Sequence, residues 1–133
     1  MELFKIFRHY WKSIIVIGCI LYLSFAPPST FQGIPTFNFE DKLVHLLMYA
    51  SLTIVLIFDH YRTVKELNVN KIAFILICLV FPTLFGGVIE IIQPLLFFPR
   101  SASWLDWLAD ILGVLIGWQT MKLIYKNLKI WHL

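Results

Sequence analysis

Three carboxylates stand inside or beside long apolar stretches of this chain, where a charge is costly. Glu90 lies near the end of one apolar segment, and Asp106 and Asp110 open the next one. An ionisable group inside a membrane span is rare, usually faces protein or water rather than lipid, and indicates a functional site by default. A carboxylate in such a place can serve as a general acid or base.

Further polar and small residues recur at helical spacing around these carboxylates, in three stripes. The stripes are Asp41, His45 and Tyr49; Gly86, Glu90 and Gln93; and Asp106, Asp110, Gly113 and Gly117. Residues three or four apart share one face of a helix. Because a charge that faces lipid costs several kcal/mol, we expect the three stripes to face one another.

The composition identifies the solvent of this chain as lipid. Of its 133 residues, 59% are hydrophobic and 14% are charged, whereas soluble domains carry about 25% charged residues. A chain of this size cannot bury so many apolar side chains in a water-facing globule. A soluble enzyme is therefore excluded. A nucleic-acid-binding role is also excluded, because the basic residues flank apolar segments instead of forming a patch.

The pattern predicts an all-α integral membrane four-helix bundle that forms a single domain over residues 1–133. The predicted spans are approximately 10–26, 41–58, 71–93 and 104–125. A basic, amphipathic lead-in is expected to lie at the membrane interface before the first span. The first run also resembles a signal peptide, but Pro27 directly after Ala26 disfavours cleavage.

Helix signals refine these boundaries. Asn38 or Asp41 is the expected N-cap of the second span, and Ser103 is the expected N-cap of the fourth. Pro82 predicts a kink inside the third span, and Pro94 is expected to end it. The segment from residue 59 to residue 70 reads as a polar loop.

The basic residues predict the orientation. Nine of the eleven Lys and Arg residues fall on one side of the four predicted spans, and only Lys42 and Arg100 fall on the other. Because basic residues concentrate in cytoplasmic loops, both termini are expected in the cytoplasm. The three polar stripes then lie at the extracytoplasmic ends of their spans, and the inner halves contain almost no polar residue. No role or surrounding group is predicted for His60 on the cytoplasmic side.

The converging stripes supply a candidate site. The predicted catalytic residues are Glu90, His45, Asp106 and Asp110, and the predicted substrate-binding residues are Lys42, Arg100, Asp41, Tyr49, Gln93 and Ser103. His45 would shuttle protons, and the two basic residues would hold a phosphate or carboxylate. No metal site is predicted, because the spacing matches no metal signature, although His45 with the carboxylates could bind a divalent cation. The cofactor is left unknown.

Each feature also has a structural interpretation. Gly113-x-x-x-Gly117 is typical of close helix packing, and Asp41 could serve only as a helix cap. The glycines also leave open a homodimer through their faces. As a set, however, the polar residues exceed what folding requires, because a purely structural network would be replaceable by apolar packing.

Three spaced motifs follow one another in the chain. They are Asp41-Lys42-x-x-His45-x-x-x-Tyr49, Gly86-x-x-x-Glu90-x-x-Gln93 and Arg100-x-x-Ser103-x-x-Asp106-x-x-x-Asp110-x-x-Gly113-x-x-x-Gly117. In order and spacing they resemble the VanZ-like family of small bacterial membrane proteins. That family usually has Asn at the position of Asp110, so this chain gains a negative charge unless Asp110 is protonated. The resemblance implies a bacterial inner (cytoplasmic) membrane protein, a cell-envelope theme and a link to resistance to glycopeptide antibiotics such as teicoplanin. It implies no reaction.

Three functions remain open on the sequence. The first is an extracytoplasmic membrane enzyme that acts on a cell-envelope lipid or a lipid-linked precursor by hydrolysis or group transfer. The second is a non-catalytic lipid-binding or glycolipid-binding accessory protein. The third is a transporter or proton relay, which the lack of polar residues in the inner halves disfavours. The sequence does not decide whether the chain is an enzyme.

Overall fold

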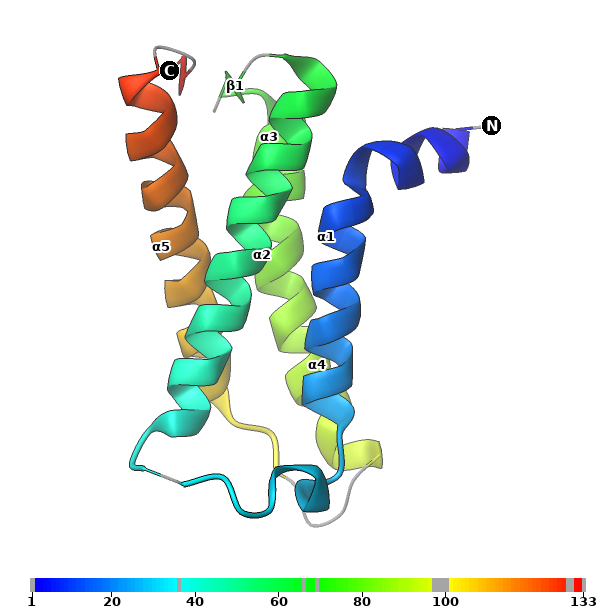
Figure 1. Cartoon of the computed structure of the whole chain (residues 1–133), viewed down its shortest axis with the longest axis vertical. Coiled ribbons are helices and arrows are strands. Elements are labelled where there is room, and N and C mark those ends of the chain that lie inside the picture. The colour runs from blue at the N-terminus through cyan, green and yellow to red at the C-terminus, as the bar shows by residue number, and fades with distance from the viewer. Residues whose placement is uncertain are drawn as a thin grey trace.

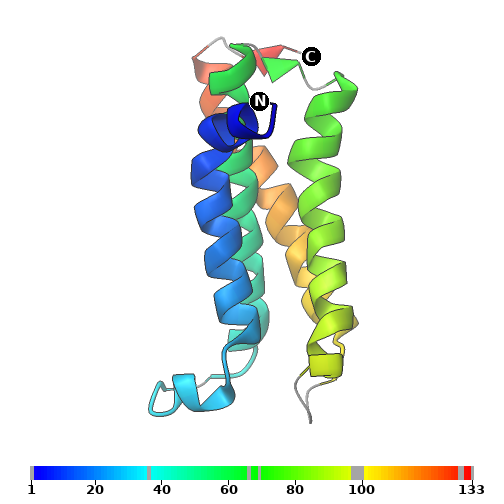
Figure 2. The ribbon, with the colours of Figure 1, turned by 90° about the vertical axis from the view of Figure 1, so that its right-hand side faces the viewer.

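Long helices run side by side along the molecule in this computed structural model, which describes residues 2–35, 37–65, 67–68, 70–96, 101–128 and 131–132 (Figures 1 and 2). The elements in chain order are α1 (Glu2–Phe25), the 3-10 turn η1 (Pro28–Phe31), α2 (Glu40–Val64), β1 (Leu67–Asn68), α3 (Ile72–Ile75), the π-helical segment η2 (Leu76–Val80), α4 (Phe81–Leu96), α5 (Trp104–Asn127) and β2 (Trp131–His132). The two short strands pair in parallel. Apart from these two-residue strands, every element of the described residues is helical, so the predicted all-α class is confirmed.

Four of the helical stretches are long and apolar enough to cross a membrane: Leu3–Phe25, Glu40–Val64, Ile72–Leu96 and Trp104–Asn127. At about 1.5 Å per residue each exceeds the roughly 30 Å of bilayer hydrocarbon. Large apolar side chains such as Leu84, Ile91 and Leu123 point outward and are exposed. Such an apolar exterior is typical of a multi-pass membrane protein and not of a water-facing one.

The first helix bends at Tyr10, whose backbone angles (φ −108°, ψ 22°) are not helical. The segment before the bend leaves the bundle at an angle, as Figure 1 shows at the N-terminal end. Its side chains Leu3, Phe4 and Phe7 are exposed. The lead-in expected from the sequence is thus a separate helical arm, while the rest of α1 packs against α2.

The second helix is longer than predicted. It continues to Val64 instead of ending at Phe58, so the loop prediction is wrong for residues 59–64. The reason is that Asp59 is fully buried and accepts hydrogen bonds from the backbone N–H (3.0 Å) and the hydroxyl (2.9 Å) of Ser13 on α1. A polar side chain with partners inside the bundle does not have to mark a loop.

His60 is also part of this buried contact. It is buried, and its Nδ1 atom lies 2.9 Å from the hydroxyl of Tyr10, with which it forms a hydrogen bond. The expectation that His60 has nothing around it is therefore wrong. So is the expectation that the inner halves of the spans contain almost no polar residue, because Asp59 and His60 both lie there.

The start of α2 also differs from prediction. Its N-cap position is Phe39, which adopts a left-handed backbone (φ 68°) and makes no side-chain cap. Neither Asn38 nor Asp41 is the N-cap. The first turn is instead fixed by Glu40, whose carboxylate accepts the N–H of Phe37 at 3.1 Å. Asp41 is free of the capping role and stays available at the helix end.

The third span is irregular just before Pro82, while the kink at Pro82 itself stays a prediction. Because proline has no N–H, the carbonyl of Cys78 one turn earlier loses its helical donor. The chain accommodates this with the π-helical segment η2 just before Pro82. The prediction that Pro94 ends the helix is wrong, since α4 continues to Leu96. A proline near the last turn removes one hydrogen bond but keeps a helical φ.

The two ends of the bundle differ: one holds the candidate site, and the other holds the described parts of the two termini. The site end is where α1 and α4 end and where α2 and α5 begin, and the described parts of both termini lie at the opposite end (Figure 1). The buried apolar side chains between the ends belong to all four long helices, and they are Ile20, Tyr49, Leu52, Leu56, Ile57, Phe74, Cys78, Ile89, Val114, Met121 and Tyr125. Both free cysteines are helical, and Cys78 is buried.

The closest packing is between α2 and α5. A Cβ atom at Gly113 would collide with the backbone of Leu46 and Ala50, and one at Gly117 would lie 2.6 Å from the carbonyl oxygen of Ala50. The interpretation of the glycine motif as close helix packing is confirmed within the chain. The homodimer through glycine faces stays a prediction.

We expect Asp59→Ala to destabilise the protein by about 2 kcal/mol or more, because the buried N–H and hydroxyl of Ser13 both lose their acceptor. Thermal unfolding in detergent, followed by circular dichroism, measures the effect. Asp59→Asn keeps one acceptor oxygen and should lose less. Equal stability of Asp59→Ala and the unchanged protein would contradict this role.

Candidate functional site

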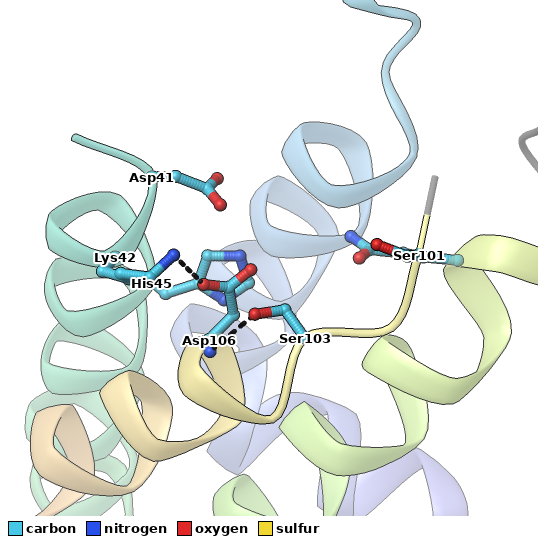
Figure 3. Close-up of a pocket in the computed structure, with 7 residues that line it drawn as sticks. Asp41, Lys42, His45, Ser101, Ser103 and Asp106 are labelled. Carbon is cyan, nitrogen blue, oxygen red and sulfur yellow. Dashed lines mark hydrogen bonds and ion pairs between the residues drawn. The ribbon is translucent and has the colours of Figure 1, made fainter. Parts of the chain in front are cut away.

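A polar pocket of about 340 Å³ opens at the site end of the bundle. Figure 3 shows its lining side chains, which come from α2, α4, the segment before α5, and α5 itself. All of them are polar, and they are Asp41, Lys42, His45, Gln93, Ser101, Ser103 and Asp106. The volume falls within the range of small-ligand sites. An apolar helical bundle thus presents a pocket with a wholly polar lining at one end.

The mouth of the pocket holds an ion pair between two helices. Lys42 Nζ on α2 donates to Asp106 Oδ1 on α5 at 2.9 Å (Figure 3). Asp106 is placed by the start of its helix, where its backbone N–H donates to the hydroxyl of Ser103 at 3.3 Å. Ser103 is therefore the N-cap of α5, as predicted. The helix cap and the ion pair together fix the Asp106 carboxylate at the pocket.

His45 lies one turn deeper on α2, and both of its ring nitrogens face carboxylates. Its Nδ1 atom forms a hydrogen bond with Asp110 Oδ1 at 2.8 Å, and both side chains are buried. A neutral imidazole that donates from Nδ1 keeps its lone pair on Nε2. That Nε2 atom lies 3.8 Å from Glu90 Oε1. Asp110 therefore orients the ring, and when Nδ1 is the donor, the lone pair of Nε2 faces Glu90.

Glu90 has one engaged oxygen and one open oxygen. Its Oε2 atom accepts the backbone N–H of Ser103 at 3.1 Å. The whole residue is only 4% exposed, and its Oε1 atom is buried and has no hydrogen-bond partner among the described residues. A buried polar atom without a partner is costly, so each one requires an explanation. Here the open oxygen points to the same region as the lone pair of His45 Nε2.

A glycine makes room for the second buried carboxylate. A Cβ atom at Gly86 on α4 would lie 2.5 Å from Asp110 Oδ2. Asp110 is 0% exposed, and its Oδ2 atom has no hydrogen-bond partner in the described part of the chain. The small residue at position 86 lets α4 approach α5 closely enough to hold Glu90 beside His45.

Two overlapping groups of side chains in the described residues have the types and spacing to hold a metal ion. One consists of Asp41, His45 and Asp106, and the other of His45, Glu90 and Asp110. In each group one ligand atom per residue lies within 4.8 Å of the others. The sequence has no metal signature because the ligands come from three helices, and only the packing of those helices brings them together.

Most of the predicted site residues meet at this end of the bundle. Six of the predicted residues line the pocket. Glu90 and Asp110 lie directly behind this lining, hydrogen-bonded to Ser103 and His45. Tyr49 is buried one turn below His45 beside Phe85, with 6.3 Å between ring centroids, and does not line the pocket. Gln93 donates to the carbonyl of Ser24 at 3.0 Å, so its amide joins α4 to α1. Arg100 lies outside the described residues.

Ser101 is a lining residue that the sequence reasoning did not assign. It is exposed and precedes the α5 cap by two residues. Its signal in the sequence was its place between Pro94 and Ser103 in a short connection. Such connections run over the surface and often supply binding residues.

Comparisons of the chain with family models, with curated proteins and with solved structures found no match. The resemblance to the VanZ-like family therefore stays a prediction. Function has to be argued from the site itself, because fold alone does not imply function.

We expect Gly86→Ala to destabilise the protein by about 1–3 kcal/mol, because the added methyl group meets the Asp110 carboxylate and forces the helices apart. Gly18→Ala is the matched control, since a Cβ at Gly18 on α1 has nothing within 4 Å. Thermal unfolding of both variants in the same detergent measures the difference. If the two substitutions have equal effects, the close approach at Gly86 is not the limiting contact.

Proposed function

We propose that the chain is a multi-pass protein of the bacterial inner (cytoplasmic) membrane, belongs to the VanZ-like family, and has both termini in the cytoplasm. The four membrane-length helices support a multi-pass arrangement. The distribution of Lys and Arg supports the orientation, because nine of the eleven lie in the first twelve residues, in residues 62–71 or after residue 121, which belong to one side of the four spans. In this orientation the site end is extracytoplasmic.

In this orientation the pocket lies at the level of lipid headgroups. His45 is five residues from the start of α2 at Glu40, which corresponds to about 8 Å along the helix. Asp106 is in the first turn of α5, and Glu90 is in the last two turns of α4. A headgroup could enter such a site while its acyl or prenyl chain stays in the bilayer.

The pocket, in this proposal, binds the polar headgroup of a membrane lipid or a lipid-linked envelope precursor and catalyses its hydrolysis or group transfer. The observation behind it is the open pair of His45 Nε2 and Glu90 Oε1, 3.8 Å apart and buried. A water molecule or an alcohol between them would face two proton acceptors. Buried, oriented acceptors of this kind are the parts that general base catalysis requires.

The other residues have supporting roles in this proposal. Asp110 orients His45 through Nδ1, in the manner of a carboxylate that fixes a catalytic imidazole. Lys42 would leave its ion pair with Asp106 and contact a phosphate or carboxylate of the headgroup instead. The carboxylate of Asp106 would then be free to accept the proton that His45 or Glu90 takes from the attacking water or alcohol, and to pass that proton to the leaving group. The link to glycopeptide susceptibility follows only from the family resemblance.

A proton relay is the second candidate, and one observation favours it. Asp59 and His60 form a buried polar group at the end opposite the pocket, and the hydroxyl of Thr53 between the two ends is buried and has no partner among the described residues. Buried apolar side chains of Leu56 and Ile57 separate Thr53 from Asp59. That apolar layer is the reason we place the relay second.

The test uses the full chain reconstituted in vesicles with two lipid probes, an anionic phospholipid and a polyprenyl diphosphate, and measures released water-soluble product by mass spectrometry. Glu90→Gln and His45→Ala should each lower turnover by about 10²-fold to 10⁴-fold, the usual contribution of a general base. Glu40→Gln is the control, because Glu40 lies at the same helix start, its carboxylate accepts the N–H of Phe37, and it does not line the described pocket.

The outcomes separate the candidates. Binding of a probe without product would leave the accessory-protein function in place and end the catalytic proposal. Proton flux across the vesicle membrane that depends on Thr53 and Asp59, without lipid binding, would favour the relay. Turnover that is unchanged in both pocket variants would contradict any role of the pocket.

A further inference from the structure

We propose that one divalent metal cation binds between His45 Nε2, in the lining of the pocket, and Glu90 Oε1, directly behind that lining, with its open coordination positions toward the pocket. The proposal deepens the function given above, and its catalytic part rests on that function. The binding of the ion itself stands on the geometry of the site and is tested separately.

The separation of the two atoms fits a shared ion better than a hydrogen bond. His45 Nε2 and Glu90 Oε1 are 3.8 Å apart, whereas hydrogen bonds of this type are about 2.7–3.2 Å long. Zinc binds imidazole nitrogen at about 2.0–2.1 Å and carboxylate oxygen at about 2.0–2.2 Å. Two ligands of one ion therefore lie roughly 3–4 Å apart, which includes the separation found here.

Both of these ligand groups are held by the contacts that usually support metal ligands. A metal-binding histidine almost always donates its other ring N–H to a carboxylate or carbonyl, and metal-binding carboxylates are themselves hydrogen-bonded. His45 donates from Nδ1 to Asp110 Oδ1, and Glu90 Oε2 accepts the N–H of Ser103. These contacts orient His45 Nε2 and Glu90 Oε1 and leave the lone pairs of both atoms available to an ion.

A second observation is that two buried carboxylate oxygens lack a hydrogen bond. Glu90 and Asp110 are 4% and 0% exposed, and each has one carboxylate oxygen without a partner among the described residues. One ligand atom from each of them and from His45 lies within 4.8 Å of the others. Apolar surroundings make such unpaired oxygens costly, and a cation would satisfy the one that faces His45.

The charge of the site also favours a cation. Four carboxylates gather here, on Asp41, Glu90, Asp106 and Asp110, and Lys42 is the one lysine or arginine that lines the described pocket. Lys42 alone offsets only one of these negative charges when a headgroup phosphate binds. A divalent cation bound to His45 and Glu90 would offset the excess negative charge and provide a positive centre to which a headgroup phosphate can bind.

The ligand types narrow the choice of ion. Imidazole is suited to zinc and the later transition metals, and carboxylates are suited to magnesium, calcium and manganese. One imidazole together with carboxylates points to Zn²⁺ or Mn²⁺ and away from Ca²⁺. In the lipid reaction the ion would make its bound water more acidic and polarise the phosphate. The proton of that water would then pass to Asp41 or Asp106, because Glu90 would already be a ligand of the ion and could not act as the base.

The test measures metal binding to the full chain, purified in detergent and stripped with a chelator. Isothermal titration with Zn²⁺ and with Mn²⁺, and metal analysis after dialysis, should give one ion per chain. His45→Ala and Glu90→Gln should abolish this binding, and Asp110→Asn should weaken it about 10-fold to 100-fold, as loss of an orienting partner usually does. His9→Ala removes a half-buried histidine of the N-terminal arm, outside the pocket, and should bind normally.

The outcomes keep the two proposals apart. Stoichiometric binding that the pocket variants lose supports the metal site, even if no lipid is turned over, in which case only the proposed function fails. Lipid turnover at full rate by stripped protein that binds neither ion overturns the metal site and leaves the proposed function in place. A thermal shift on addition of Zn²⁺ in the unchanged protein, equal in the His45→Ala variant, would also overturn the site. Circular dichroism of each variant shows that it is folded.

Discussion

The charged groups of α2, α4 and α5 can remain in an apolar bundle only because they face one another. Asp110 is fully buried and is paired with His45 across the α2–α5 contact at 2.8 Å. Glu90 on α4 reaches the same histidine and is fixed by the N–H of Ser103. Removing one member leaves an uncompensated charge, which is costly in such surroundings. The three helices are therefore coupled at the site end through one imidazole ring.

Close helix packing makes this arrangement possible. Gly113 and Gly117 let α5 approach the backbone of α2, and Gly86 leaves space for the Asp110 carboxylate. In lipid there is little hydrophobic drive between helices, so such small residues and polar contacts largely decide which faces meet. These three glycines thus help to set the positions of His45, Glu90 and Asp110.

The periodic features of the sequence predicted the fold well. Apolar runs predicted four membrane-length helices, the four-residue spacing of Asp41, His45 and Tyr49 predicted a shared face, and Ser103 was recognised as a cap. These features are local, so they can be read without knowing what lies beside them. The convergence of the stripes followed from the cost of facing lipid.

The features that could not be predicted depend on distant partners. Asp59 and His60 looked like loop residues because Ser13 and Tyr10, which bind them, are more than forty positions away. The orientation of the His45 ring depends on Asp110, which is 65 positions away in the chain. For the same reason the spacing of residues along the chain indicated no metal signature, although the ligands meet in space.

The most direct test of the account is an experimental structure in a lipid bilayer at a resolution that defines ordered ions. The account predicts density between His45 Nε2 and Glu90 Oε1 for a cation, with a headgroup or phosphate beside it in the pocket. A site in which water alone fills the pocket, and every carboxylate is paired internally, would contradict it. The polar cluster would then serve only to hold the helices together.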